Sequence, residues 1–200
     1  MNQELFFDIE TTGLPQKNAN WETDFREGFP YIVSISWIYR DQVYDIILNQ
    51  EGRTIPEDVI KIHGITNEMA EKSQYILKDI LALFMGHAME ADGIVGHNIY
   101  FDISVLKANV LREFQNDPDF EQVKEFICKA LDKDKRVDTM QKSTKFCNIK
   151  QPGSERIKWP TLGELYYILF KETFQEHNGK EDVLACRRAY YELKKLQVII

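Results

Sequence analysis

The sequence predicts a single α/β domain over residues 1–200, with a mixed five-stranded sheet flanked by helices. Three strand-like segments precede any long helix, and strand-like and helix-like segments then alternate to the end of the chain. Composition is the third observation, because 200 residues with 44% hydrophobic and 12% aromatic side chains can bury one substantial core.

The first strand is predicted around residues 5–10 and is followed by the turn-like Thr11, Thr12 and Gly13. It is apolar on both faces up to Phe7, which is typical of a strand inside a sheet. Side chains alternate along a strand, so the carboxylates of Asp8 and Glu10 share one face. Burying two neighbouring anions is costly unless a cation such as a divalent metal compensates. Taken alone, these residues slightly favour a plainer interpretation, in which the strand ends at the surface with both carboxylates in water.

A β-hairpin is predicted next to this strand, because residues 31–40 and 42–48 are rich in β-branched and aromatic side chains and a short break separates them. The polar stretch 16–30 before the hairpin is long for a loop inside a compact domain. It is interpreted either as a rim over the two carboxylates or as decoration.

A short helix is predicted over 56–63, with proline in its first turn and Gly64 as its stop, followed by a polar turn at 65–67. Apolar residues at helical spacing predict a long helix over 74–91. The glycine-bounded run 93–98 predicts a fourth strand.

The helix that starts at Ile99 carries an unusual acid, since Asp102 lies beside its apolar stripe in the first turn. A weaker helix is predicted over 119–130, and a fifth strand at 137–140. A capping box at Thr161 opens the next helix, which is predicted to run through Phe170.

The last predicted helix covers 181–196, and Asp182 lies one turn before Cys186 on its core stripe. His177 precedes this helix in a His-Asn-Gly turn. Buried acids from two helices and the Asp8 and Glu10 pair would be separate energetic penalties, whereas one shared metal site removes them together. The whole pattern therefore favours a metal site.

Charge and composition limit the partners and the compartment. The net charge of −7 argues against a duplex-binding protein that works by neutralising many phosphates, although a small acidic cleft could reach phosphate through metal ions. No apolar run approaches the roughly 20 residues of a membrane helix, so we expect no membrane association and a cytoplasmic location. The three widely spaced cysteines fit free thiols in a reducing compartment.

Four segments together resemble the motif set of the DEDDh, or DnaQ-like, 3′-5′ exonucleases, and they occur in the right order across nearly the whole chain. Members of this family include the proofreading epsilon subunits of bacterial DNA polymerase III and ribonuclease T. One position departs from the family pattern: two residues after His177, where the family often has alanine, this chain has Gly179. The segments are Asp8–Leu14, His63–Thr66, Gly96–Asp102 and His177 followed by Asp182.

The resemblance implies a ribonuclease H-like fold and a metal-dependent exonuclease. Asp8, Glu10, Asp102 and Asp182 would bind two divalent cations, Mg²⁺ or Mn²⁺, which suit hard oxygen ligands. His177 would be the general base that takes a proton from the attacking water, because an imidazole has an ordinary pKa near the working pH. The products would be nucleoside 5′-monophosphates released from a 3′ end.

The resemblance also implies a set of substrate contacts, which suit a single strand whose end needs no duplex opening. For His63, a plain helix-stop role remains a competing interpretation. The implied contact residues are Thr11, Thr12, Gly13, Leu14, His63, Ile65, Asn98 and Phe101.

Single-stranded 3′ ends are the expected partner, and single-stranded DNA is the favoured substrate, with a DNA polymerase subunit as a further partner if the chain acts in proofreading. A 3′-5′ exoribonuclease is the alternative, since no residue separates ribose from deoxyribose. Two other classes are disfavoured. A catalytically silent binding module would not need all four acids and the histidine, and the turn motifs count against a small-molecule phosphodiesterase.

Overall fold

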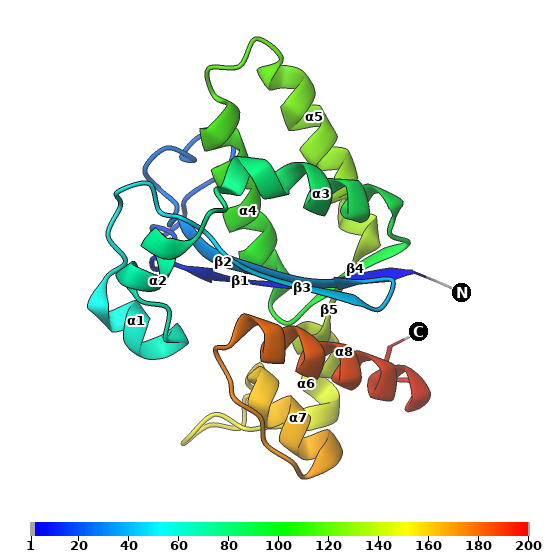
Figure 1. Cartoon of the computed structure of the whole chain (residues 1–200). Coiled ribbons are helices and arrows are strands. Elements are labelled where there is room, and N and C mark those ends of the chain that lie inside the picture. Colours follow the sequence, from blue (N-terminus) through cyan, green and yellow to red (C-terminus); the bar gives the residue numbers. More distant parts are fainter. Residues whose placement is uncertain (1–2, 200) are drawn as a thin grey trace.

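The computed structural model describes residues 3–199 and contains the predicted mixed five-stranded sheet with helices on both faces (Figure 1). Antiparallel pairing joins β1 to β2 and β2 to β3, and parallel pairing joins β1 to β4 and β4 to β5. The spatial order is β3-β2-β1-β4-β5, so β1, which carries Asp8 and Glu10, is the central strand. The strands are β1 (Glu4–Thr11), β2 (Ile32–Tyr39), β3 (Gln42–Ile47), β4 (Gly93–Gly96) and β5 (Arg136–Asp138).

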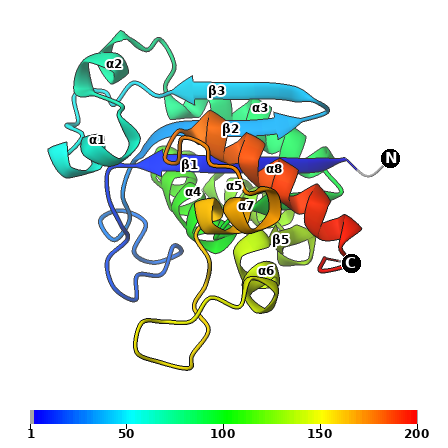
Figure 2. The ribbon, with the colours of Figure 1, turned by 90° about the horizontal axis from the view of Figure 1, so that it is seen from below.

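Two groups of helices cover the two faces of the sheet, and β1 contributes to both cores (Figures 1 and 2). Phe7 and Ile9 pack on the side of α3, α4 and α5, whereas Phe6 packs on the side of α7 and α8. Because side chains alternate, Asp8 and Glu10 point to the same side as Phe6. The helices are α1 (Glu57–His63), α2 (Asn67–Lys72), α3 (Leu77–Glu90), α4 (Ile99–Phe114), α5 (Phe120–Ala130), α6 (Thr139–Cys147), α7 (Leu162–Phe170) and α8 (Gly179–Lys195).

Most predicted elements are present, with ends that shift by a few residues. The capping box at Thr161 opens α7 as predicted, and Gly64 ends α1 in the left-handed conformation at φ +75°. Within residues 3–199, no helix combines the length and the apolar composition needed to cross a membrane.

Two helices were not predicted, and side-chain caps explain both. The polar turn expected at 65–67 instead leads into α2, because the Thr66 hydroxyl accepts a hydrogen bond from Met69 N. The strand expected at 137–140 ends at Asp138, because the Asp138 carboxylate accepts hydrogen bonds from Met140 N and Gln141 N and thereby starts α6.

The stretch 16–30 is anchored to α4. Phe25 and Phe29 are buried in the core on that side of the sheet, and the Arg112 guanidinium donates hydrogen bonds to the backbone carbonyls of both. None of its residues lines the cavity that contains Asp8 and Glu10. The cavity lining therefore gives no support to a rim over the carboxylates, and the buried Phe25 and Phe29 anchor a largely exposed stretch to the core.

Candidate active site

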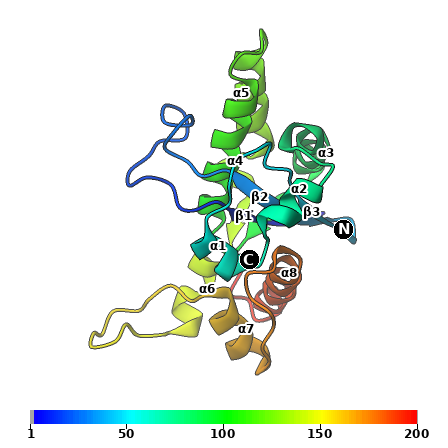
Figure 3. The same ribbon diagram turned by 60° about the vertical axis from the view of Figure 1, so that its left-hand side comes forward.

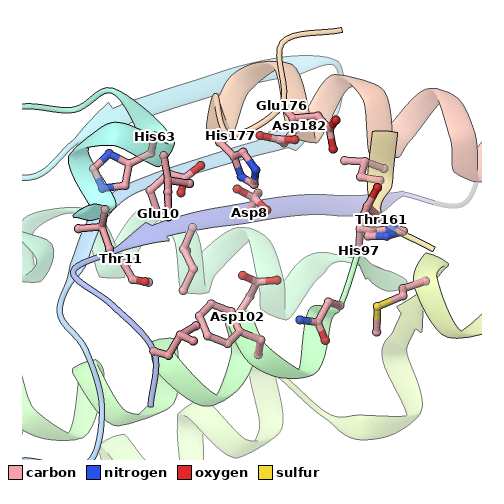
Figure 4. Close-up of a pocket in the computed structure, with 18 of the residues that line it drawn as sticks. Asp8, Glu10, Thr11, His63, His97, Asp102, Thr161, Glu176, His177 and Asp182 are labelled. Atoms are coloured by element: carbon pink, nitrogen blue, oxygen red, sulfur yellow. The ribbon is translucent and has the colours of Figure 1, made fainter. Parts of the chain in front are cut away.

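Three carboxylates from the two ends of the chain meet at the central strand. Asp8 and Glu10 come from β1, and Asp182 comes from the first turn of α8 (Figure 4). One carboxylate oxygen from each of the three lies within 4.8 Å of the others. Residues separated by more than 170 positions in the sequence thus form one acidic cluster.

The fourth predicted acid, Asp102, is buried in the first turn of α4 and lies across the cavity from Asp8 (Figure 4). Asn98, which precedes α4, has the left-handed φ of +66°, and its backbone N–H donates to the Asp138 carboxylate at 3.1 Å. The end of β5 thereby fixes the start of α4. This contact holds Asp102 at the cavity, where β4 ends beside the middle of β1.

Burial raises the pKa values of all four acids. Burial is the main cause for each of them, and the charges of the other acids add to it for Asp8, Glu10 and Asp102. The pKa of Glu10 rises to about 8 and that of Asp182 to about 7, whereas those of Asp8 and Asp102 are raised well above the ordinary value. As bare anions, the four groups would oppose folding.

The chemistry of this donor set fits divalent metal. All of the clustered ligand atoms are carboxylate oxygens, which Mg²⁺, Mn²⁺ and Ca²⁺ prefer over the nitrogen and sulfur that dominate zinc sites. A cation between the carboxylates would also reverse the electrostatic penalty that raises their pKa values.

His177 lies over Asp8 in the same cavity (Figure 4). Its backbone has the left-handed φ of +62° and immediately precedes Asn178, whose side chain accepts a hydrogen bond from Glu181 N and caps α8. The neighbouring Glu176 carboxylate accepts a hydrogen bond from Gly163 N in α7 at 3.2 Å. The turn that presents His177 is thus held by the N-terminal ends of two helices.

The cavity has a volume of about 580 Å³, and most of the predicted contact residues line it. At one end, Leu14 is 83% exposed and His63 is buried. The His63 Nδ1 atom accepts a hydrogen bond from Ile65 N, and the Nε2 atom has no partner within the described residues. The predicted contacts that line the cavity are Thr11, Gly13, Leu14, His63, Asn98 and Phe101.

Two predicted contacts, Thr12 and Ile65, lie outside the cavity lining, and a contact of either residue with substrate stays a prediction. Ile65 packs in a small core with Val33 and Ile55, so its side chain is occupied in holding α1 and α2 to the sheet. The Thr12 hydroxyl accepts a hydrogen bond from Tyr31 N and ties the end of β1 to the start of β2.

Sequence reasoning missed several lining residues at the other end of the cavity. Trp159 is 63% exposed, and Pro160, Thr161 and Met140 lie beside it in the lining. Glu176 was also missed, as was Ile62, which stands near His63 and is 55% exposed. A tryptophan followed by proline outside any predicted helix or strand was the available signal for this end.

His97 fixes that end of the cavity to the sheet. Burial lowers the pKa of His97 to about 4, so its ring is neutral. Its Nε2 atom lies 3.0 Å from the Pro160 carbonyl oxygen, which can only accept, so Nε2 carries the proton. Its Nδ1 atom lies 3.0 Å from the Thr139 hydroxyl.

The chain that forms this site belongs to a known sequence family. The family model described as exonuclease, RNase_T, matches residues 5–190. The epsilon subunit of DNA polymerase III from Haemophilus influenzae is 29% identical over 106 residues. That match spans 52% of this chain and 40% of the subunit.

Solved exonucleases share the fold. E. coli exonuclease I in complex with a dT13 oligonucleotide has a TM-score of 0.67 at 18% identity, over 98% of this chain and 42% of that one. Exonuclease X in complex with 5′ overhanging duplex DNA has a TM-score of 0.53 at 17% identity, over 96% and 92% of the two chains. This chain thus spans about two fifths of exonuclease I and nearly all of exonuclease X.

Proposed function

Because this chain belongs to the RNase_T family of exonucleases and is a DnaQ-like DEDD member of it, we propose that it is a metal-dependent 3′-5′ exonuclease of single-stranded DNA. It would release nucleoside 5′-monophosphates one at a time. The observation that carries the proposal is the convergence of Asp8, Glu10 and Asp182 within 4.8 Å, with Asp102 facing them and His177 above.

The four acids hold two divalent cations, Mg²⁺ or Mn²⁺, in this proposal. When bound, the cations supply positive charge to the phosphodiester and favour ionisation of the attacking water. Asp8 and Glu10 are fixed by the central strand, whereas Asp102 and Asp182 are fixed by the first turns of α4 and α8. Ligands on rigid elements place the reacting groups without a further cost in chain entropy.

His177 is the general base. A neutral ring nitrogen accepts the proton of the attacking water while the oxygen atom of that water bonds to phosphorus. The bond between phosphorus and the 3′-oxygen of the preceding nucleotide then breaks, and this oxygen takes up a proton from water. The products are a nucleoside 5′-monophosphate and a strand shortened by one nucleotide with a new 3′-hydroxyl group.

The terminal nucleotide lies at the end of the cavity formed by Leu14 and His63. Leu14 offers an exposed apolar side chain to the base, and the buried His63 ring lines the cavity at this end. Thr11, Gly13 and Phe101 complete this end, and Asn98 orients the start of α4. An unpaired strand end fits, because its base is free to leave a stack.

DNA is the favoured substrate because the named relatives are a DNA polymerase subunit and exonucleases whose structures were solved in complex with DNA. The similarity to the polymerase III epsilon subunit also supports a proofreading role beside a polymerase. Since the match spans only part of that subunit, the polymerase partner is part of the proposal rather than of the family assignment.

Digestion of labelled oligonucleotides tests the proposal. Matched DNA and RNA strands, single- and double-stranded and labelled at the 5′ end, would be digested side by side. The single-stranded DNA should shorten fastest, by single nucleotides, with Mg²⁺ or Mn²⁺ and stay intact with a chelator. The Asp8→Asn variant is the control for contaminating nucleases. Preferential loss of RNA would replace the DNA assignment, and cleavage inside the strand or from its 5′ end would overturn the polarity.

A further inference from the structure

The candidate active site has a second apolar end that no role above uses. His63 and Thr11 lie at one end of the cavity, His97 and Thr161 lie at the other, and Asp8 and Asp102 lie between them (Figure 4). Trp159 stands at the second end, and its side chain is 63% exposed. A phosphodiester at the acids would therefore have an exposed apolar side chain on each side of it.

The backbone around Trp159 is fixed although its side chain is exposed. The Pro160 carbonyl accepts from His97 at 3.0 Å, and Lys158 N donates to the Ile149 carbonyl at 2.8 Å. The Lys158 ammonium group pairs with Glu164, whose carboxylate also caps the backbone of Thr161. A large aromatic ring held open to solvent on a rigid backbone is prepared to stack on a ligand, because binding orders little additional chain.

Basic residues gather in the segment 142–158, which leads to Trp159 and is called the basic arm here. Residues 149–158 form a hairpin joined by a bridge between Lys150 and Ile157 (Figures 2 and 3). The segment 142–158 contains five basic residues and one acidic residue, in a chain whose net charge is −7. Lys142, Lys145 and Arg156 are exposed, and within residues 3–199 none of them forms an ion pair.

We propose that the strand on the 5′ side of the scissile bond stacks the penultimate base on Trp159 and then runs along the basic arm. Every base has a face that can stack on indole, and surface cations attract the phosphates that follow. The proposal deepens the exonuclease assignment and rests on it, because the terminal nucleotide must occupy the Leu14 end. Trp159 is thus a subsite residue, and His97 positions it.

A double-mutant cycle between the protein and the DNA tests the stack. Binding of a 12-nucleotide strand with a nuclease-resistant phosphorothioate at its last linkage would be measured by fluorescence anisotropy. We expect Trp159→Ala to raise Kd about 5- to 150-fold, the range for loss of one base stack. Trp159→Phe should recover most of the affinity, and Phe126→Ala, at an exposed aromatic of α5, should leave it unchanged.

The decisive strand carries an abasic site at the penultimate position. If Trp159 stacks that base, Trp159→Ala should change the affinity for the abasic strand less than twofold. An equal loss with normal and abasic strands would overturn the stack, and so would unchanged binding of normal DNA. A wild-type protein that cleaves no strand would instead overturn the exonuclease proposal itself.

Salt dependence tests the arm. With Lys145→Glu and Arg156→Glu together, the slope of log K against log salt should become shallower by about 1.4, the value for two lost contacts to a single strand. This difference in slope between the variant and the wild type should vanish for trinucleotides, which are too short to reach the basic arm. Lys78→Glu on α3, on the other face of the sheet, is the charge-matched control. A slope equal to that of the wild type would overturn this part of the path.

Discussion

Gly179 packs directly against Ser36, so closely that a Cβ atom on Gly179 would lie 2.6 Å from the Ser36 Oγ atom and 3.9 Å from a carboxylate oxygen of Asp8. This contact explains the one departure from the family pattern, which often has alanine two residues after the histidine. Ser36 on β2 fills the space that an alanine would need, and its hydroxyl donates to the Asp45 carboxylate at 2.7 Å. Ser36 on β2 therefore requires a residue without a side chain at position 179 of α8.

Gly179→Ala should lower both stability and activity, although alanine suits a helix better than glycine. Overpacking of this kind costs about 1–3 kcal/mol, and here it pushes the start of α8 away from Asp8. Adding Ser36→Ala should restore part of the loss, because the nearest remaining atom, Ser36 Cβ, lies 3.3 Å from the new methyl group. Thermal unfolding and kcat of the two single variants and the double variant check this; strictly additive losses would contradict it.

The order of the elements was predictable because local signals agree with tertiary contacts at the long elements. β1 has only apolar side chains between Glu4 and Asp8, and the capping box at Thr161 starts α7 by itself. The short elements were harder to predict from the sequence. Whether the residues after Asp138 extend a strand or begin a helix depends on where the Asp138 carboxylate points, and the spacing of side chains does not reveal that.

The acids of the site were predictable because each breaks an apolar pattern at a buried position. Trp159 was not assigned to the site, because the capping box that follows it indicates a structural role. The contact of this segment with His97, which is 62 positions away, becomes visible only in the fold. The Ile65 side chain packs in the small core beneath α1 and α2, a position that its place in the motif did not indicate.

Asp182→Asn should raise stability and destroy activity. Burial raises the pKa of Asp182 to about 7, so at pH 8.5 the metal-free protein holds a buried anion that asparagine replaces with a neutral group of similar shape. We expect the melting temperature without metal to rise by about 2–5 °C. Cleavage should fall at least ~100-fold because a metal ligand is lost.

Differential scanning fluorimetry with a chelator and oligonucleotide digestion with Mg²⁺ measure the two effects. At pH 5.5, where the Asp182 carboxyl group of the wild type is protonated, the gain in melting temperature should largely disappear. A variant that is less stable at pH 8.5 would show that Asp182 has a structural role instead.

The metal-free protein should become less stable as the pH rises from about 5 to 9. The folded pKa values of Glu10 and Asp182 are raised, to about 8 and about 7, above the ordinary values near 4. Between those limits the folded state binds more protons than the unfolded state, so unfolding becomes more favourable as protons are removed. Melting curves across this range should show the decline.

Saturating Mg²⁺ should reverse the trend, because the cation binds the ionised carboxylates of the folded state only. The stabilisation by Mg²⁺ should therefore be larger at pH 8.5 than at pH 6. A metal effect that does not change with pH would mean that Mg²⁺ binds elsewhere.

His177→Ala should lower kcat by about 10²- to 10⁴-fold, the usual contribution of a general base. Affinity for Mg²⁺ or Mn²⁺, measured by calorimetry, should stay within about twofold, because the carboxylates and not the imidazole hold the metal in our proposal. Added imidazole should restore part of the rate. Loss of metal binding would move His177 into the metal site.

Gly163→Ala should separate stability from catalysis at the turn that carries His177. Gly163 lies in the first turn of α7, where alanine alone would favour the helix by up to ~1 kcal/mol. A Cβ atom there would, however, overlap the Glu176 carboxylate, which accepts a hydrogen bond from Gly163 N beside His177. Displacing Glu176 moves the turn, so we expect kcat to fall by about tenfold with little change in melting temperature.

Gly86→Ala is the matched control, because Gly86 lies in α3 and a Cβ atom there meets open space. It should keep full activity and gain slightly in stability. The double variant Gly163→Ala with Glu176→Ala should keep the helix gain but not regain the rate, since no carboxylate then holds the turn. If Gly163→Ala alone keeps the rate of the wild type, the contact between Glu176 and α7 has no part in placing His177.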